Sequence, residues 1–239
     1  MPGSWEITKQ RDERLLVAII CPPDLGVTLN FSQNMRNIQL PPGSDFMKVI
    51  GLPYGPARNQ ALKACVEQNY NLAFLDADVR IESDAFMKLL ETKLDIVSGL
   101  YYQRFHPYMP VMFNEGRNEN GESVRVPVIG WKPGDVVPCD FIPSGLTIYR
   151  LNMLRAMLNV YPLPFMWGVD IAPVPDVGGS VAPAMSEDFS FSWKAKQIGY
   201  RGYVMTSVVG LHETRAVIGP KWLIPAPSPD PTNGMIGVV

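Results

Sequence analysis

The chain has 239 residues, of which 46% are hydrophobic and 18% charged, and its formal net charge at pH 7 is −2. This length can bury a sizeable core as one large domain or two small ones. The charge excludes a strongly basic nucleic-acid-binding protein, and no apolar run approaches the roughly 20 residues of a membrane span. The polar N-terminus is no signal peptide. Three widely spaced cysteines, Cys21, Cys65 and Cys139, favour a reduced, cytoplasmic setting.

Strands and helices are expected to alternate along most of the chain. Apolar runs bounded by turn residues predict strands at 15–21, 46–50, 72–75, 95–102, 141–149 and 203–209. Capping residues and small-residue faces predict helices at 55–68, 84–92, 151–159 and 186–199. This alternation is typical of an α/β fold with helices on both faces of the sheet.

Segments rich in Pro and Gly separate or follow these elements. Residues 105–140 are expected to form short strands and turns. Residues 168–185, with Gly178-Gly179-Ser180 at their centre, are either a functional lid or disordered. We expect one domain over 1–219, followed by a Pro-rich tail over 220–239.

The most informative segment is Leu72-Ala73-Phe74-Leu75-Asp76-Ala77-Asp78, in which a buried strand ends in two carboxylates. Residues two apart in an extended strand point to the same side. Carboxylates that converge repel each other unless a cation lies beside them. Oxygen ligands suit Mg²⁺ or Mn²⁺, ions that commonly accompany a diphosphate. A polar turn after a core strand is the alternative interpretation.

Three other polar positions are candidates for a functional site. Glu187 and Asp188 begin a helix, where acids also complement the helix dipole. His212 follows the last predicted strand and is either a ligand or a surface residue. Arg58 lies in the first turn of a helix, where a cation is unfavourable, so it needs an anionic partner such as a phosphate, a nucleotide or a carboxylate. A solvated surface Arg is the alternative.

In this order, the motifs resemble the glycosyltransferase A fold, in particular family 2-like transferases that use nucleotide-diphosphate sugars. The resemblance covers about residues 15–214 and is most specific in Phe74-Leu75-Asp76-Ala77-Asp78 and in the helix from Ser186 to Gly199-Tyr200. It implies a Rossmann-like, three-layer α/β/α domain with a mostly parallel central sheet. It also implies a Mn²⁺- or Mg²⁺-dependent enzyme with a UDP- or GDP-type sugar donor. The acceptor would be a glycan, a lipid-linked molecule or a small molecule with a hydroxyl group.

The resemblance assigns roles to most of the candidate residues. Asp78 and His212 would bind the metal, Asp76 the ribose or the metal, and Asp188 would be the general base of an inverting transfer. By the same resemblance, Ser144 and Gly145 would line the donor-sugar pocket. Pro22, Arg58, Trp167 and Glu187 complete the predicted donor-binding residues. Trp167, which follows Phe165-Met166, would stack on a sugar ring or pack in the core.

The chain departs from the family pattern in two places. No clear acid follows the second strand to bind the nucleotide base, since Asp24 and Asp45 match poorly. The Gln-x-x-Arg-Trp motif of processive synthases and their membrane helices are absent, which favours a soluble enzyme that transfers one sugar at a time.

Three other functions are compatible with parts of the same pattern. A haloacid-dehalogenase-like phosphatase would also use an Asp-x-Asp pair such as Asp76 and Asp78, although there the motif lies nearer the N-terminus. A sugar-nucleotide pyrophosphorylase would need a Gly-rich, Arg-containing loop after the first strand, which residues 21–26 do not provide. A non-catalytic carbohydrate-binding module would need neither metal nor nucleotide.

Overall fold

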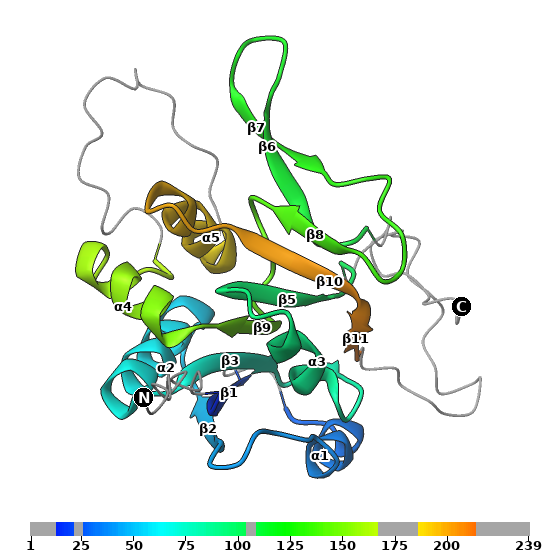
Figure 1. Ribbon diagram of the computed structural model, residues 1–239, viewed down its shortest axis with the longest axis vertical. Coiled ribbons are helices and arrows are strands. Elements are labelled where there is room, and N and C mark those ends of the chain that lie inside the picture. Colours follow the sequence, from blue (N-terminus) through cyan, green and yellow to red (C-terminus); the bar gives the residue numbers. More distant parts are fainter. Residues whose placement is uncertain (1–12, 22–25, 104–108, 167–185, 214–239) are drawn as a thin grey trace, which may run out of the picture.

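The computed structural model describes residues 13–21, 26–103, 109–166 and 186–213. At its centre is a seven-stranded sheet in the order β2-β1-β3-β9-β5-β10-β8 (Figure 1). Its strands are β1 (Leu15–Cys21), β2 (Asp45–Ile50), β3 (Asn71–Asp76), β5 (Ile96–Leu100), β8 (Val136–Cys139), β9 (Leu146–Tyr149) and β10 (Gly202–Val209). Two small ladders accompany it: β6 (Phe113–Arg117) with β7 (Ser123–Pro127), and β4 (Val79–Arg80) with β11 (Leu211–His212).

The central sheet is mixed, but most of its strands share one direction. Strands β1, β2 and β3 pair in parallel, and so do β5 and β10. Strand β9 runs antiparallel to both β3 and β5, and β8 runs antiparallel to β10. Because β9 is reversed and Leu146 pairs with Leu75, the start of β9 lies beside the carboxyl end of β3. This register brings Gly145 to Asp76.

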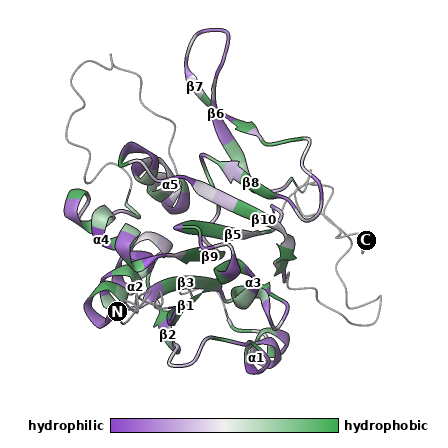
Figure 2. Cartoon of the chain, viewed as in Figure 1, coloured by the Kyte–Doolittle hydropathy of each residue, from purple (hydrophilic) through white to green (hydrophobic). Residues whose placement is uncertain are grey.

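Helices cover both faces of the sheet, which confirms the three-layer α/β/α arrangement. One face packs against α2 (Tyr54–Gln68), α4 (Leu151–Val160) and α5 (Glu187–Gln197), and the other against α1 (Leu29–Arg36) and α3 (Ala85–Glu91). The central strands are predominantly hydrophobic, whereas the helices carry hydrophilic residues on their outer sides (Figure 2). This pattern is expected for strands that are buried on both faces.

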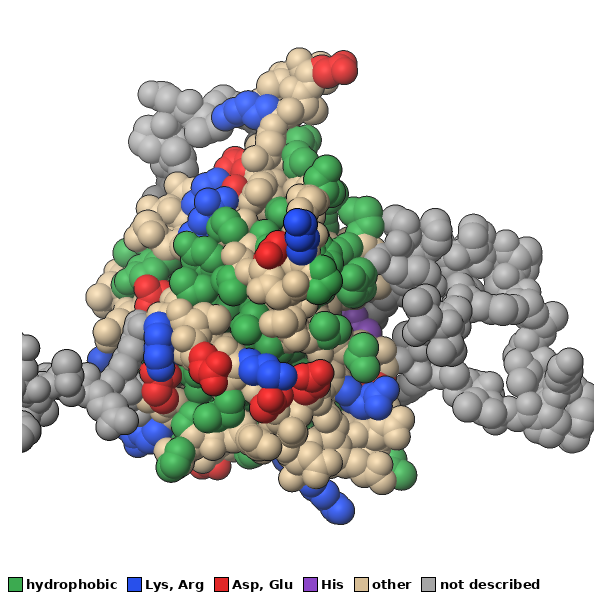
Figure 3. All heavy atoms as spheres, turned by 45° about the vertical axis from the view of Figure 1, so that its right-hand side comes forward, with side chains coloured by type: hydrophobic (Ala, Val, Ile, Leu, Met, Phe, Trp, Pro, Cys, Tyr) green, Lys and Arg blue, Asp and Glu red, His purple; other side chains and the backbone are tan. Residues whose placement is uncertain are grey.

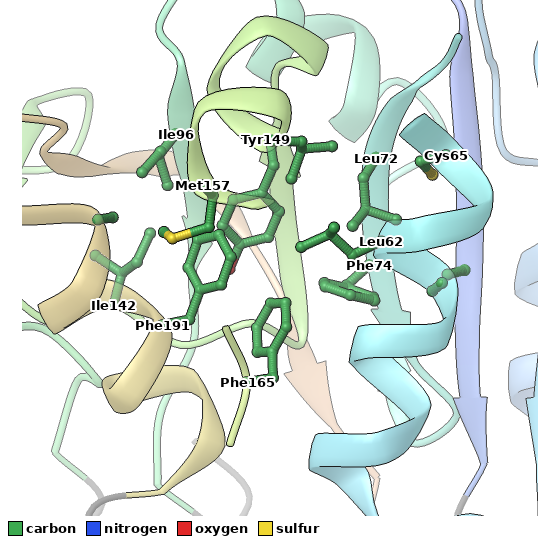
Figure 4. Close-up of a cluster of buried hydrophobic side chains, with 14 of the residues drawn as sticks. Leu62, Cys65, Leu72, Phe74, Ile96, Ile142, Tyr149, Met157, Phe165 and Phe191 are labelled. Carbon is green, nitrogen blue, oxygen red and sulfur yellow. The ribbon is translucent and has the colours of Figure 1, made fainter. Parts of the chain in front are cut away.

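An aromatic cluster fills the core between the sheet and the helices α2, α4 and α5 (Figure 4). Phe165 and Phe191 stack with their ring centroids 4.3 Å apart, and Tyr149 lies edge-on to Phe191 at 4.8 Å. Phe74 of β3 makes further edge contacts with Tyr149 and Phe165. Truncation of such a buried ring to Ala typically costs about 3–5 kcal/mol. The same cluster fixes the strand end that carries Asp76.

The structure adds elements that the sequence did not predict. Helix α1 begins after Thr28, whose Oγ1 accepts a hydrogen bond from the backbone N–H of Phe31. Thr is a common N-cap residue, so the sequence did contain a signal for this helix. The surrounding residues are mostly polar, however, and the helix was not predicted. Helix α3 begins at Ala85 rather than Asp84, and Asp84 occupies the cap position without capping it through its side chain.

Charges on the outer surface are mixed in sign. On the face shown in Figure 3, acidic and basic side chains alternate below a hydrophobic area, and no large basic patch is visible there. Of the helices in the described ranges, none is long and apolar enough to cross a membrane.

Candidate functional site

The site is built around the carboxyl end of β3, where Asp76 is 7% exposed. Its backbone N–H donates to the carbonyl oxygen of Gly145 at 2.9 Å. A Cβ atom on Gly145 would lie 2.8 Å from Asp76 Oδ2 and 2.9 Å from Tyr101 Oη. Contacts this short leave no room for a side chain, so only glycine fits at position 145. The structure thus brings Asp76 together with the predicted Ser144-Gly145 segment.

Arg58 of α2 is the cation at the centre of this site. It is 2% exposed, and its Nη2 donates to both oxygens of Asp76 at 2.9 and 3.2 Å. Its Nε lies 3.4 Å from Glu187 Oε1, and its Nη1 donates to the carbonyl oxygen of Ser144 at 3.3 Å. The anionic partners of Arg58 in this structure are therefore two carboxylates from distant parts of the chain.

Electrostatics keep the Arg58 guanidinium charged. Burial by itself lowers its pKa, but the carboxylates of Asp76 and Glu187 outweigh burial and raise the pKa above the usual value. The guanidinium also lies over the Phe74 ring at 4.8 Å from the centroid. Arg58 thus links the Asp-x-Asp strand to the first turn of α5.

Asp188 lies beside Glu187 in the first turn of α5 and is half-buried. Burial, and next the neighbouring charge of Glu187, raise its pKa to about 6. The hydroxyl of Ser186 and the backbone N–H of Phe189 donate to Asp188 Oδ1 and oppose this shift. A carboxylate in this state can hold or release a proton near neutral pH, which suits acid–base chemistry.

Ser186, the capping residue of the helix predicted at 186–199, does not cap α5 through its side chain. It occupies the N-cap position, but its side chain makes no hydrogen bond to the helix backbone. Its hydroxyl instead bonds the Asp188 carboxylate. The N-cap position of Ser186 was thus predicted correctly, whereas the hydrogen bond of its side chain was not.

Asp78 lies in the turn between β3 and β4, not in the strand itself. The strand-alternation argument consequently does not set its direction. Its position is set by the β4–β11 ladder, in which Val79 pairs with His212 and the backbone N–H of Glu213 donates to the Asp78 carbonyl oxygen at 2.7 Å. The ladder brings Asp78 and His212 to neighbouring positions, although they are far apart in sequence.

The donor chemistry of Asp78 and His212 fits a divalent ion. Asp78 supplies carboxylate oxygens and is 3% exposed. His212 Nδ1 lies 2.7 Å from the carbonyl oxygen of Tyr102, which can only accept, so Nδ1 carries the hydrogen and Nε2 bears the lone pair in the neutral ring. Within the described residues, no group of three or more His, Cys, Asp or Glu side chains converges on one point. A bound ion would therefore need further oxygens from a ligand or water.

Tyr101 is a site residue that the sequence analysis missed. Its hydroxyl oxygen accepts a hydrogen bond from the Gly145 backbone N–H at 2.8 Å, and its ring lies edge-on to His212 at 5.0 Å. Burial, followed by the charges of Asp76 and Asp188, raises its pKa well above the usual value, so the phenol stays protonated. Its sequence context is an ordinary strand end, which gave no functional signal.

A second side chain without a sequence signal is Lys194, which is fully buried in α5. Its Nζ donates to the carbonyl oxygens of Leu163 and Met166 at 3.2 and 2.7 Å. The Phe165 backbone N–H donates to Asn59 Oδ1 at 3.1 Å. These contacts hold the segment that leads from α4 towards the site against α2 and α5.

Several predicted positions lie outside the described residues. These are Pro22, Trp167, the segment 168–185 and the Pro-rich residues 220–239. A cavity of about 490 Å³ that the described residues form lies beside α1 and β11, not at Asp76 or Asp188.

Comparisons with known proteins identify the fold. Neither a family model nor a curated protein matches the sequence. The crystal structure of A197 from STIV matches with a TM-score of 0.55 and 19% identity, over 84% of this chain and 86% of that chain. The crystal structure of GalNAc-T7 with UDP, GalNAc and Mn²⁺ matches with a TM-score of 0.54 and 11% identity, over 85% of this chain and 44% of that chain.

This chain therefore spans less than half of the GalNAc-T7 chain. Identities this low establish the architecture alone. The chain has the α/β fold of the glycosyltransferase A class, with its mixed seven-stranded central sheet. The predicted fold class is confirmed.

Proposed function

We propose that the protein transfers a sugar from a nucleotide-diphosphate donor, of the UDP or GDP type, to an acceptor hydroxyl. The observation that carries this proposal is the Arg58 network, which joins Asp76 at the end of β3 to Glu187 at the start of α5. Asp188, with a pKa raised to about 6, follows Glu187 in the first turn of α5, and its charge acts on Arg58, which supports its assignment to the same site. The fold supports the reading, because solved structures with this fold include a protein bound to UDP, GalNAc and Mn²⁺.

Asp188 acts as the general base. An acceptor hydroxyl becomes nucleophilic as it loses its proton, and a carboxylate within hydrogen-bond reach can take that proton. The α5 dipole favours the ionised carboxylate by about 0.3–1 kcal/mol, but burial and Glu187 outweigh it and the pKa stays at about 6. Asp188 is then mostly ionised at neutral pH and still basic enough to accept a proton. The transfer inverts the anomeric configuration if the hydroxyl attacks the donor directly.

Asp78 and His212 are the residues that would hold a Mn²⁺ or Mg²⁺ ion. Such an ion, if bound there, would supply positive charge that offsets the charge of the diphosphate leaving group. Both oxygens of Asp76 already accept hydrogen bonds from Arg58. We therefore assign Asp76 to positioning, or to the ribose, rather than to the metal. Ser144 and Gly145 line the donor side, with Tyr101 beside them.

The test is release of nucleoside diphosphate from a panel of UDP- and GDP-sugars with Mn²⁺ and simple hydroxyl acceptors. Asp188→Asn should lower turnover by about 100-fold or more and leave donor binding unchanged. Asp84→Asn is the matched control, because Asp84 also lies at a helix start, in α3, but away from the cluster. Equal turnover for Asp188→Asn and the wild type would remove the base assignment. A product that retains the donor's configuration would assign Asp188 a supporting role.

The competing functions make different predictions in the same assay. A phosphatase that uses Asp76 as nucleophile would need that carboxylate to attack phosphorus, yet Arg58 engages both of its oxygens. Such an enzyme would release inorganic phosphate. A carbohydrate-binding module would release neither product with any donor.

A further inference from the structure

A cavity of about 490 Å³ lies between helix α1 and the small β4–β11 ladder. One wall consists of four carboxamide side chains, those of Asn30, Gln33 and Asn34 in α1 and of Asn37 at its C-cap. Their spacing of three, four and seven residues places them on one face of the helix. The opposite wall includes Arg80, Glu82 and Leu211. None of these residues belongs to the Arg58 network.

The two walls are fixed relative to each other. Asn34 Nδ2 donates to the carbonyl oxygen of Ile81 at 2.7 Å, and the Ile81 N–H donates to Asn34 Oδ1 at 2.9 Å. This two-way bond ties α1 to the chain that leaves β4, so the cavity does not have to form on binding. A preformed site avoids part of the entropy cost of ordering its walls.

The charges that line the cavity are neutralised by neighbours. Arg80 Nε lies 2.7 Å from Glu213 Oε1, and Glu82 Oε2 lies 2.7 Å from Lys88 Nζ. A phosphate or a nucleotide would need cations that are not already engaged by carboxylates. The cavity therefore suits a ligand without net charge.

The lining favours many hydrogen bonds rather than burial of apolar surface. Each carboxamide offers two N–H donors and a carbonyl acceptor, which complement adjacent hydroxyl groups that both donate and accept. Asn30, Gln33 and Asn37 are exposed and able to make such bonds. Leu211, 55% exposed, adds an apolar surface for the C–H face of a ring. A volume of about 490 Å³ lies within the usual range for ligand sites.

We propose that this cavity binds a neutral oligosaccharide, at a site separate from the transfer site. The β4–β11 ladder connects this cavity with the transfer site. Arg80 and Leu211, which line the cavity, pair with each other, and the next pair in the ladder is Val79 with His212. A glycan held here would lie next to the residues assigned to the metal. The proposal does not depend on catalysis, because binding needs neither donor nor metal.

The experiment is ligand-observed NMR of the full chain with maltotriose, chitotriose and mannotriose, without nucleotide or metal. At least one trisaccharide should bind, with a Kd on the order of 1 mM. Asn30→Ala/Gln33→Ala should weaken that binding by about 10-fold or more, because the hydrogen bonds that these two side chains make to the saccharide are lost. Gln60→Ala/Gln68→Ala removes two exposed carboxamides from α2 and is the matched control with unchanged binding.

Three results would overturn the proposal: no binding of any of the three saccharides, equal binding by the two double variants, or displacement of the bound saccharide by UDP with Mn²⁺. Displacement would mean that the cavity belongs to the donor site. Binding that persists in Asp188→Asn supports the cavity independently of transfer. A failure of the transferase assay and a failure of this site are therefore distinguishable.

Discussion

We expect the stability of the fold to depend more strongly on Arg58 than on any other charged residue, and Arg58→Met tests that expectation. Methionine keeps much of the aliphatic length but removes the cation. Asp76, at 7% exposure, and the partly buried Glu187 would then face each other without a counter-ion. Breaking a buried ion pair by removing one partner costs about 3–5 kcal/mol. Loss of the cation over the Phe74 ring adds about 0.5–2 kcal/mol.

The assay is urea unfolding followed by tryptophan fluorescence near neutral pH. We expect Arg58→Met to lower the free energy of unfolding by about 3.5–7 kcal/mol, a large part of the roughly 5–15 kcal/mol typical of a domain. Arg155→Met, at an exposed position of α4, is the control and should change it by less than about 0.5 kcal/mol. The double variant Arg58→Met/Asp76→Asn should recover part of the loss, because the stranded charge is gone.

The pH dependence distinguishes this mechanism from a simple packing defect. Stranded carboxylates can take up protons in acid, so the loss for Arg58→Met should be smaller at about pH 5 than at about pH 7.5. A loss below about 1 kcal/mol, or a loss that is the same at both pH values, would refute the reasoning that Arg58 stabilises the site by charge.

Three further predictions follow from the same contacts. The pKa of Asp188 is raised above its unfolded value of 3.8 to about 6, so the unfolded chain loses this proton first and stability falls as pH rises from about 4 to about 6. Asp188→Asn should remove this fall and raise the free energy of unfolding at neutral pH by about 1–2 kcal/mol, after allowance for partial exposure. Denaturant unfolding measured across this pH range tests the assignment, which is wrong if the stability of the variant still falls with pH. Lys194→Met should destabilise the fold by about 2–4 kcal/mol, because the carbonyl groups of Leu163 and Met166 lose their donor. Lys196→Met, at a partly buried position of the same helix with ion pairs near the surface, should cost less than about 1 kcal/mol. Similar thermal shifts for the two variants would argue against a structural role of Lys194. His212→Ala should weaken Mn²⁺-dependent nucleotide binding at least about 10-fold in calorimetry while the fold is retained. Unchanged binding would mean that His212 is a surface residue without a role in metal binding.

Much of the fold could be predicted because local signals and the hydrophobic pattern agree. The run from Leu15 to Cys21 is apolar throughout and forms the predicted strand, buried on both faces. Helix α2 ends at Gln68, as predicted, and α5 begins at Glu187 after Ser186. The Asp-x-Asp motif and the α5 acids carried the resemblance to the glycosyltransferase A fold, which the structural matches confirm.

Other features depend on partners that sequence patterns do not specify. Helix α1 has mostly polar neighbours, so its existence was settled by the Thr28 cap and by burial of Phe31 against the sheet. Strand β9 inserts between β3 and β5 and runs against both, which no local pattern in Leu146–Tyr149 indicates. Tyr101 and Lys194 look like an ordinary strand end and an ordinary helix surface until their partners are in place.

The sequence by itself determined the alternation of strands and helices, the fold class and the candidate acids, because hydrophobic period, caps and short motifs are local properties of the chain. Only the tertiary structure decided the contacts among those acids. Arg58, Asp76 and Glu187 come from separate elements, and their hydrogen bonds exist because β3, α2 and α5 pack around one aromatic core. Burial in that packing, together with Glu187, sets the charge state of Asp188, and burial is a property that residues acquire only from neighbours distant in the chain.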